Sequence, residues 1–240
     1  MLARFIVLVV IIFVVLGGCR AGLQPGGVIG SGRAVTQTYD FSDFDRVELS
    51  DAFEAEITAA DGYKVEVTVD DNLVDRLQVE QHGNAVKIGL KPFTSVINGH
   101  MQARISLPAL ASLDASGASR ASVTGFRTDK NTQFSVSGAS EIRGDMETGD
   151  LIADASGGST LRLTGRGSAI RANASGASTI DLQDFTGGDA DVEASGASRI
   201  ELNSSGTLNA KASGASTVHY AGDVTLGQVD ESGASTVSKR

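Results

Sequence analysis

The 240-residue chain contains no tryptophan, only three prolines and a single cysteine, and basic residues are the minority among its charged side chains. A lone cysteine excludes an internal disulfide framework. With 20 basic and 29 acidic residues, the net charge of -9 offers no positive field to a phosphate backbone, which excludes nucleic acid as an expected partner. The three histidines, His82, His100 and His219, lie too far apart in the sequence to indicate a metal or catalytic site, and we expect no cofactor.

Long apolar runs are missing as well, apart from an uncharged stretch over residues 5–16 that follows Arg4. Its 12 residues are too few to cross a bilayer core, which needs about 20. A basic residue, a short apolar region and small residues before a cleavage point are typical of an export signal. The sequence therefore predicts a signal peptide over residues 1–18.

The only cysteine follows this region directly, in the segment Leu16-Gly17-Gly18-Cys19. This segment resembles the lipobox of bacterial lipoproteins, which implies cleavage before Cys19 and transfer of diacylglycerol to its thiol. Arg20, rather than an aspartate, comes next, and this resembles the default export to the outer membrane in Gram-negative cells. We therefore expect an exported protein that is held in the bacterial cell envelope by a lipid anchor at Cys19.

Glycine is abundant after the cysteine, with five glycines between residues 20 and 34. Because glycine-rich segments behave as flexible chains, residues 19–34 are predicted to form a tether between the lipid and a domain. The whole chain has 29 glycines, yet 41% of its residues are hydrophobic, which is more apolar surface than a disordered chain carries. We therefore expect residues 35–240 to fold as one domain.

A repeated tetrapeptide organises the second half of the chain. Ser-Gly-Ala-Ser begins at Ser116, Ser137, Ser175, Ser195, Ser213 and Ser232, and the variant Ser-Gly-Gly-Ser begins at Ser156. The seven starting points are separated by 21, 19, 19, 20, 18 and 19 residues. A period of this length, in units rich in glycine, serine and β-branched residues, favours a β repeat over a helical one.

Apolar and polar residues alternate on both sides of each tetrapeptide. The position three before the first serine is apolar in every unit: Leu113, Phe134, Ala153, Ala172, Val192, Ala210 and Val229. The position one before it is apolar except at Glu231, and the position five after it is apolar from Ala121 to Val237. Period-two alternation predicts a strand with one buried face before the tetrapeptide and another after it.

Equivalent strands about 19 residues apart can pair in parallel only if the chain winds as a coil. The sequence therefore predicts an all-β protein, a parallel β-helix or β-solenoid with about seven turns over residues 114–240. Glycine permits a positive φ and a close backbone approach at each corner. The predicted structural corner glycines are Gly117, Gly138, Gly157, Gly176, Gly196, Gly214 and Gly233.

The other corner positions lead to three further expectations. The third corner residue, such as Ala177, is expected to pack inward, because only a small side chain would fit there. The corner serines are expected to form hydrogen bonds along the stack. Glu231 is expected to face solvent, as a residue of the terminal turn would.

Residues 35–113 repeat less regularly, and we expect them to form an irregular β-rich cap and the first coils. Ser50-Asp51-Ala52-Phe53 is predicted to be a degenerate corner, residues 82–84 the turn of a hairpin, and residues 70–77 one helical turn. Such a cap would cover a ladder edge that otherwise invites aggregation.

The repeated corners and three segments of the cap resemble one bacterial family, called putative auto-transporter adhesin, head GIN domain. The segments are Phe-Ser-Asp-Phe-Asp-Arg-Val-Glu-Leu-Ser over residues 41–50, Asp-Asn-Leu over 71–73 and Gly-Leu-Lys-Pro over 89–92. The resemblance covers about residues 33–240. It implies a β-helix-like fold on exported, often lipid-anchored envelope proteins, and an adhesin function, but it assigns no functional residues.

One outward position of the repeats carries the strongest cluster of charges. Arg143, Arg162, Asp181 and Glu201 each lie six residues after a corner serine, so they are expected on consecutive turns. They form either a site for a charged sugar or a solvated ladder of complementary charges, in which each pair contributes ~0–1 kcal/mol. We favour the ladder.

Two classes of function remain. A binding module would use the long exposed sheet to contact polysaccharide, an envelope protein or a second copy of itself. A carbohydrate-active enzyme, a polysaccharide lyase or hydrolase, would need convergent carboxylates, or a carboxylate with lysine or arginine, in a local cleft. Because serine recurs at every corner, it indicates a structural role rather than a nucleophile, and we favour a non-catalytic binding module.

Overall fold

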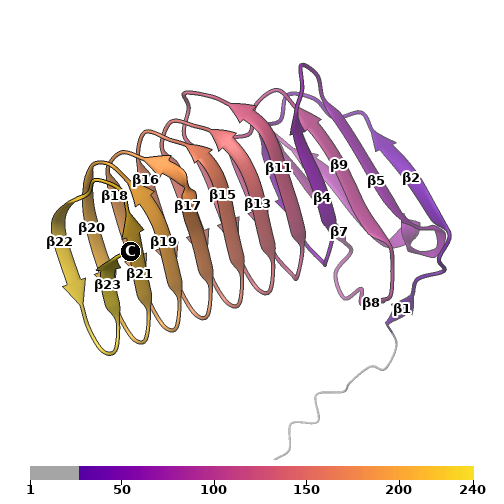
Figure 1. Ribbon diagram of the computed structural model, residues 1–240. Coiled ribbons are helices and arrows are strands. Elements are labelled where there is room, and N and C mark those ends of the chain that lie inside the picture. The colour runs from indigo at the N-terminus through magenta and orange to yellow at the C-terminus, as the bar shows by residue number, and fades with distance from the viewer. Residues whose placement is uncertain (1–26) are drawn as a thin grey trace, which may run out of the picture.

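The computed structural model describes residues 27–240, so the predicted signal peptide and Cys19 lie outside the described residues. The described chain is all-β and winds as a two-sheet solenoid from an N-terminal cap to the C-terminal turn (Figure 1). The predicted fold class is confirmed.

Two large sheets form the two faces of the solenoid. The ten-stranded sheet contains, in spatial order, β22 (Thr225–Glu231), β20 (Thr207–Ala212), β18 (Ala190–Ala194), β16 (Ile170–Ala174), β14 (Leu151–Ala155), β12 (Thr132–Val136), β10 (Ser112–Ala115), β3 (Arg46–Leu49), β7 (Ala85–Leu90) and β6 (Leu77–His82). The eleven-stranded sheet contains β2 (Ala34–Tyr39), β5 (Lys64–Asp70), β9 (Met101–Leu107), β4 (Glu54–Ala59), β11 (Arg120–Arg127), β13 (Glu141–Glu147), β15 (Thr160–Arg166), β17 (Thr179–Gly187), β19 (Arg199–Ser204), β21 (Thr217–Ala221) and β23 (Thr236–Lys239).

The regular repeats contain seven strand pairs, from β10 and β11 to β22 and β23, and the chain makes about six turns between the first pair and the last. Each strand pairs in parallel with the equivalent strand of the next turn, and Phe134 lies in register between Leu113 and Ala153. All three side chains are 0% exposed. The core is therefore a set of apolar ladders, in which each fully buried large side chain contributes ~1.5–3 kcal/mol.

The corner glycines behave as their position in the repeat predicts. All seven have a positive φ, between 63° and 76°. At Gly157 an added Cβ would lie 2.7 Å from the carbonyl oxygen of Gly138 in the preceding corner. Any larger residue would therefore be strained in its backbone and would also push consecutive turns apart.

The inward corner position is the second serine rather than the third residue. Ala177 is exposed, as is the third residue of the other corners up to Ala234, so the expectation that this residue packs inward is wrong. Ser178 is 1% exposed, and its Oγ donates to the carbonyl oxygens of Ala155, at 3.1 Å, and Ser175, at 2.8 Å. The predicted serine ladder is confirmed, because equivalent bonds from Ser159, Ser198, Ser216 and Ser235 also reach back one turn.

The cap contains one further turn and a set of antiparallel strands. β3 and β4 are joined by a corner at residues 50–53, as predicted, with a positive φ at Asp51 and Ala52. On their N-terminal side lie β7 and β9, which pair in parallel with β3 and β4. This spatial order differs from the order in the sequence, where β7 and β9 come after β3 and β4. β6 pairs with β7 as the predicted hairpin, and η1, a 3-10 helix over Asp71–Arg76, is the predicted helical turn.

The described part of the predicted tether is bound to the cap. β1 (Val28–Ile29) pairs with β8 (Val96–Ile97), and the Ser31 amide donates to Asn72 Oδ1 at 3.1 Å. β2 begins at Ala34 and covers the edge of β5. The prediction of a flexible tether up to residue 34 is therefore wrong for residues 27–34, whose partners come from distant parts of the sequence.

The last turn is the least buried of the regular ones. Every residue of β22 is exposed, including Leu226 at 51% and Val229 at 36%. Glu231 faces solvent, as expected, and replaces the apolar residue that the other turns bury at this position. Within residues 27–240, no helix has the length and apolar character needed to cross a bilayer.

Candidate binding surface

Two rows of side chains run across the outer face of nine strands of the eleven-stranded sheet, from β9 to β23, with one residue from each of these strands. The first row, from β9 to β23, is Gln102, Glu54, Arg120, Glu141, Thr160, Thr179, Arg199, Thr217 and Thr236. The second row is Arg104, Glu56, Ser122, Arg143, Arg162, Asp181, Glu201, His219 and Ser238. Because the strands are parallel and in register, neighbours in a row are about 4.8 Å apart, close enough for opposite charges to pair.

The structure places Arg143, Arg162, Asp181 and Glu201 on four consecutive strands of the second row. Their charges are neutralised locally. Arg162 Nε lies 2.8 Å from Asp181 Oδ2, and Arg143 Nε lies 2.5 Å from Glu141 Oε1 on its own strand. Glu201 lies 3.6 Å from both Arg199 and Arg240. This arrangement is a ladder of compensated ion pairs, and the four groups do not converge on one point.

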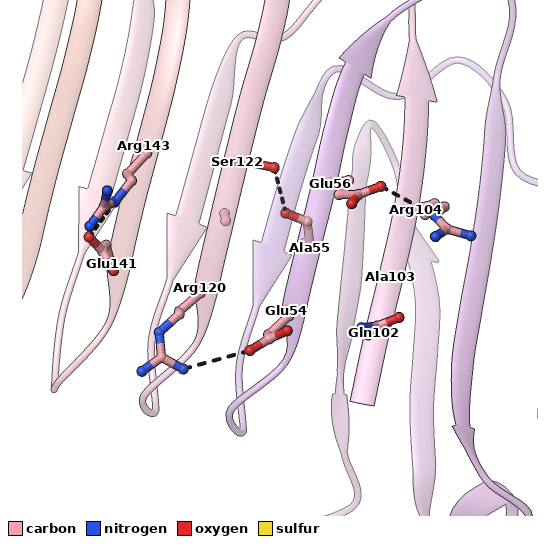
Figure 2. A pocket seen from close by; sticks show the side chains of 11 residues that line it. Glu54, Ala55, Glu56, Gln102, Ala103, Arg104, Arg120, Ser122, Glu141 and Arg143 are labelled. Atoms are coloured by element: carbon pink, nitrogen blue, oxygen red, sulfur yellow. Dashed lines mark hydrogen bonds and ion pairs between the residues drawn. The ribbon is translucent and has the colours of Figure 1, made fainter. Parts of the chain in front are cut away.

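A shallow groove of about 410 Å³ lies where the cap meets the regular turns. Figure 2 shows its lining, which comes from β9, β4, β11 and β13. Its polar lining residues are Glu54, Glu56, Gln102, Arg104, Arg120, Ser122, Glu141 and Arg143. The other three lining residues, Ala55, Ala103 and Ala121, are buried and belong to the core. We call this feature the junction groove.

Acidic and basic groups alternate across the junction groove. On β4, Glu56 lies 3.2 Å from Arg104 and Glu54 lies 3.8 Å from Arg120. The partners of the two glutamates therefore come from opposite sides of that strand (Figure 2). Ser122 Oγ donates to the carbonyl oxygen of Ala55 at 3.4 Å. Guanidinium, carboxylate and amide groups in a row form a surface that can donate and accept hydrogen bonds along an extended polar ligand.

Only Arg143 of the four predicted residues lines the junction groove. The sequence did contain a signal for the outward position of Glu54 and Glu56, because they alternate with the apolar Ala55 and Ile57 directly after the degenerate corner at residues 50–53. Gln102 and Arg104 had no such signal, because β9 pairs with β4 although the partners Glu56 and Arg104 are 48 positions apart in the sequence. The sequence pattern could not place that strand at the groove.

Aromatic side chains contribute nothing to this face in the regular turns. Phe126, Phe134, Phe185 and Tyr220 are all buried, with Tyr220 the most exposed at 8%. The described residues also contain no group of three or more histidine, cysteine, aspartate or glutamate side chains placed to hold a metal ion. Ligand binding at the junction groove would therefore depend on polar contacts.

The fold and its outer face define a capped two-sheet β-solenoid with a polar ladder surface. Residues 43–223 match the family described as putative auto-transporter adhesin, head GIN domain, and the chain belongs to that family.

Solved structures show the same fold. A putative adhesin from Bacteroides fragilis has a TM-score of 0.80 at 17% identity, with 89% of this chain and 100% of that chain covered. A protein described as a putative lipid binding protein, from Parabacteroides distasonis, has a TM-score of 0.74 at 17% identity over 90% of this chain and 100% of that chain. A putative adhesin from Parabacteroides merdae has a TM-score of 0.68 at 16% identity over 89% and 99%. No curated protein matches this chain.

Proposed function

We propose that the protein is a non-catalytic envelope lipoprotein whose solenoid face binds a polysaccharide at the junction groove. The observation that supports this most directly is the distribution of charge. Alternating ion pairs continue over successive strands, and the groove extends over four of them. A glycosidase or lyase would instead need two groups held on either side of one bond.

Polysaccharide fits this groove better than an envelope protein does. Protein interfaces are usually centred on buried aromatic or aliphatic anchors. The junction groove is lined by charged and amide side chains, with alanine as the only apolar residue type. Planar groups such as those of Arg104, Arg120 and Glu54 suit the paired hydroxyl groups of a sugar chain. An envelope protein and a second copy of the chain are the alternative partners.

The location is part of the proposal. The predicted signal peptide at residues 1–18 and the lipobox-like segment before Cys19 support export and lipid anchoring in the envelope. The family description and the relatives described as putative adhesins agree with a role at the cell surface. The outer membrane follows if the cell is Gram-negative.

The test compares two arginines of the same row. Arg120 lines the junction groove and pairs with Glu54 at 3.8 Å, whereas Arg199 lies outside the groove and pairs with Glu201 at 3.6 Å. A glycan array with purified protein identifies the bound polysaccharide. We expect Arg120→Gln to weaken its binding about tenfold, the value of one charged hydrogen bond, and Arg199→Gln to leave it unchanged.

Three results would contradict the proposal. Equal effects of the two substitutions would remove the junction groove from the binding site. No glycan binding, together with capture of an envelope protein that Arg120→Gln abolishes, would favour a protein partner. Shortening of a polysaccharide that one groove substitution abolishes, with the fold unchanged by circular dichroism, would favour an enzyme.

A further inference from the structure

A small apolar patch is exposed at the base of the cap. Ile29 is 66% exposed, Ile97 is 47% exposed and Phe93 is fully exposed. They are three of only seven large hydrophobic side chains exposed in residues 27–240. Ile29 and Ile97 are direct cross-strand partners in the sheet of β1 and β8, which Figure 1 shows below the cap. We call Ile29, Phe93 and Ile97 the basal patch.

Phe93 occupies a backbone position that normally requires glycine. The Thr94 amide donates to the Lys91 carbonyl oxygen at 3.2 Å, Pro92 follows Lys91, and Phe93 has a φ of 65°. Proline followed by a residue with positive φ is the pattern of a type II turn, where glycine or asparagine is favoured at the second central position. A phenylalanine there is strained, and no packing within the domain compensates for it. Strained residues of this kind cluster at functional sites.

The backbone of the basal patch is hydrogen-bonded to the cap. The Val28 amide donates to the Ser95 carbonyl oxygen at 2.8 Å, which joins β1 to the segment that carries Phe93. The Gly30 amide donates to the Ile97 carbonyl oxygen at 3.0 Å, and Asn72 Nδ2 donates to the Ile29 carbonyl oxygen at 2.8 Å. The backbone that carries the three side chains is thus positioned by hydrogen bonds before any partner binds.

The position of the patch in the chain indicates what covers it. Ile29 is ten residues after Cys19, and eight peptide units separate Cys19 from Gly27. A fully extended chain of that length spans at most about 29 Å. A lipid on Cys19 would therefore keep the basal patch close to the bilayer surface. Phenylalanine and isoleucine are the kind of side chain that enters the boundary between headgroups and acyl chains.

We propose that the basal patch inserts into the membrane that carries the lipid anchor, with Phe93 at its tip. This rests on the proposed anchoring at Cys19. Insertion of the patch would orient the solenoid relative to the bilayer, which a lipid attached at a single residue does not do by itself. The bilayer would also cover the one aromatic side chain that the domain leaves fully exposed.

The absence of tryptophan makes a direct test possible, since Phe93→Trp creates a single indole reporter. Leu226→Trp is the matched control, because Leu226 is 51% exposed at the opposite end of the solenoid. Each lipidated protein is reconstituted into phosphatidylcholine vesicles, with or without bromine on the acyl chains. We expect the indole at position 93 to emit at shorter wavelength and to be quenched by the brominated lipid, and the indole at position 226 to show neither effect.

Flotation of the vesicles distinguishes a failure of the lipid anchor at Cys19 from a failure of the basal patch to insert into the membrane. If both proteins float and the indole at position 93 is not quenched, the anchor stands and membrane insertion of the patch is wrong. If neither floats, the anchor is wrong and the inference falls with it. A blue shift without vesicles that grows with protein concentration would assign the patch to a second copy instead. Ile97→Trp repeats the measurement should Phe93→Trp fail to fold.

Discussion

At each solenoid corner, a glycine and a serine have different tasks. The first glycine turns the backbone and lets consecutive corners stack, while the second serine ties its turn to the preceding one through a buried hydroxyl. Ser178 bonds to two carbonyl oxygens, one in each of two turns. The residue between them, Ala177, points into solvent. Packing in the core therefore does not explain why the side chain at this position is small.

The variant corner at Ser156 offers a matched pair of adjacent glycines. Gly157 has a φ of 73° and would place a Cβ 2.7 Å from the Gly138 carbonyl oxygen. We expect Gly157→Ala to lower the free energy of unfolding by at least about 1–2 kcal/mol, the cost of a left-handed residue with a Cβ, before the clash is added.

Gly158 provides the control, because an added Cβ would meet only the Gly138 carbonyl oxygen at 3.8 Å. Gly158→Ala restores the alanine of the other corners and should raise the free energy of unfolding by ~0.4–1 kcal/mol, since it restricts the unfolded chain. Urea titration of the two variants measures both values. Equal destabilisation by both would show that the tight contact belongs to the whole corner and not to its first glycine.

At the scale of elements, η1 fixes the chain that leads to β2. Ser31 Oγ donates to Asp71 Oδ1 at 2.5 Å, and Arg33 lies 2.8 Å from Asp71 Oδ2. These contacts, with the Ser31 hydrogen bond first and Arg33 after it, lower the pKa of Asp71 below its usual value. Because the pKa of Asp71 is lower in the folded than in the unfolded protein, its contacts with Ser31 and Arg33 stabilise the fold at pH values above the unfolded pKa. This stabilisation is lost as the pH falls through the folded pKa.

This linkage predicts an acid-dependent loosening of residues 31–33. An NMR titration should show the Ser31 and Arg33 amide signals moving with a midpoint below the ordinary aspartate pKa of about 3.9. Asp71→Asn should remove that midpoint. Asp75→Asn, an exposed position on the same 3-10 helix, should leave it in place. A midpoint that survives Asp71→Asn would assign the loosening to another carboxyl group.

For the whole molecule, the two ends of the solenoid differ. The N-terminal end is covered by antiparallel strands and carries the basal patch, whereas the last turn exposes Leu226 and Val229. Turns of a solenoid contact only their neighbours, so stability decreases toward an end that is not covered. The junction groove lies on the covered half, close to the cap.

Anchoring at Cys19 has a direct test at this scale. Cys19→Ser removes the thiol that the lipid would modify, and we expect the protein to move from the membrane to the soluble fraction. Detergent phase partitioning of the two forms measures this change. Retention of Cys19→Ser in the detergent phase would show that the basal patch alone, or another segment, holds the protein at the membrane.

The sequence by itself determined the solenoid. Each repeat encodes its own strands, because inward residues such as Leu113, Phe134 and Ala153 recur at one position of each unit and pair with the next unit. The corner glycines follow from the same register, and so does the placement of Arg143, Arg162, Asp181 and Glu201 on successive strands. Local periodicity carries this information because each turn rests on the turn that precedes it in the chain.

Only the tertiary structure decided where the cap, the groove and the patch lie. β9 pairs with β4 across the cap, and the chain then returns to the other side of β4 to form β11, an order with no periodic signature. Arg104 reaches the junction groove by that pairing, and Ile29 meets Ile97 by another. The sequence did not determine the orientation of Ala177 either, since a small side chain suits a corner whether it points into the core or into solvent. Contacts between distant segments depend on the whole packed cap, so no single stretch of sequence encodes them.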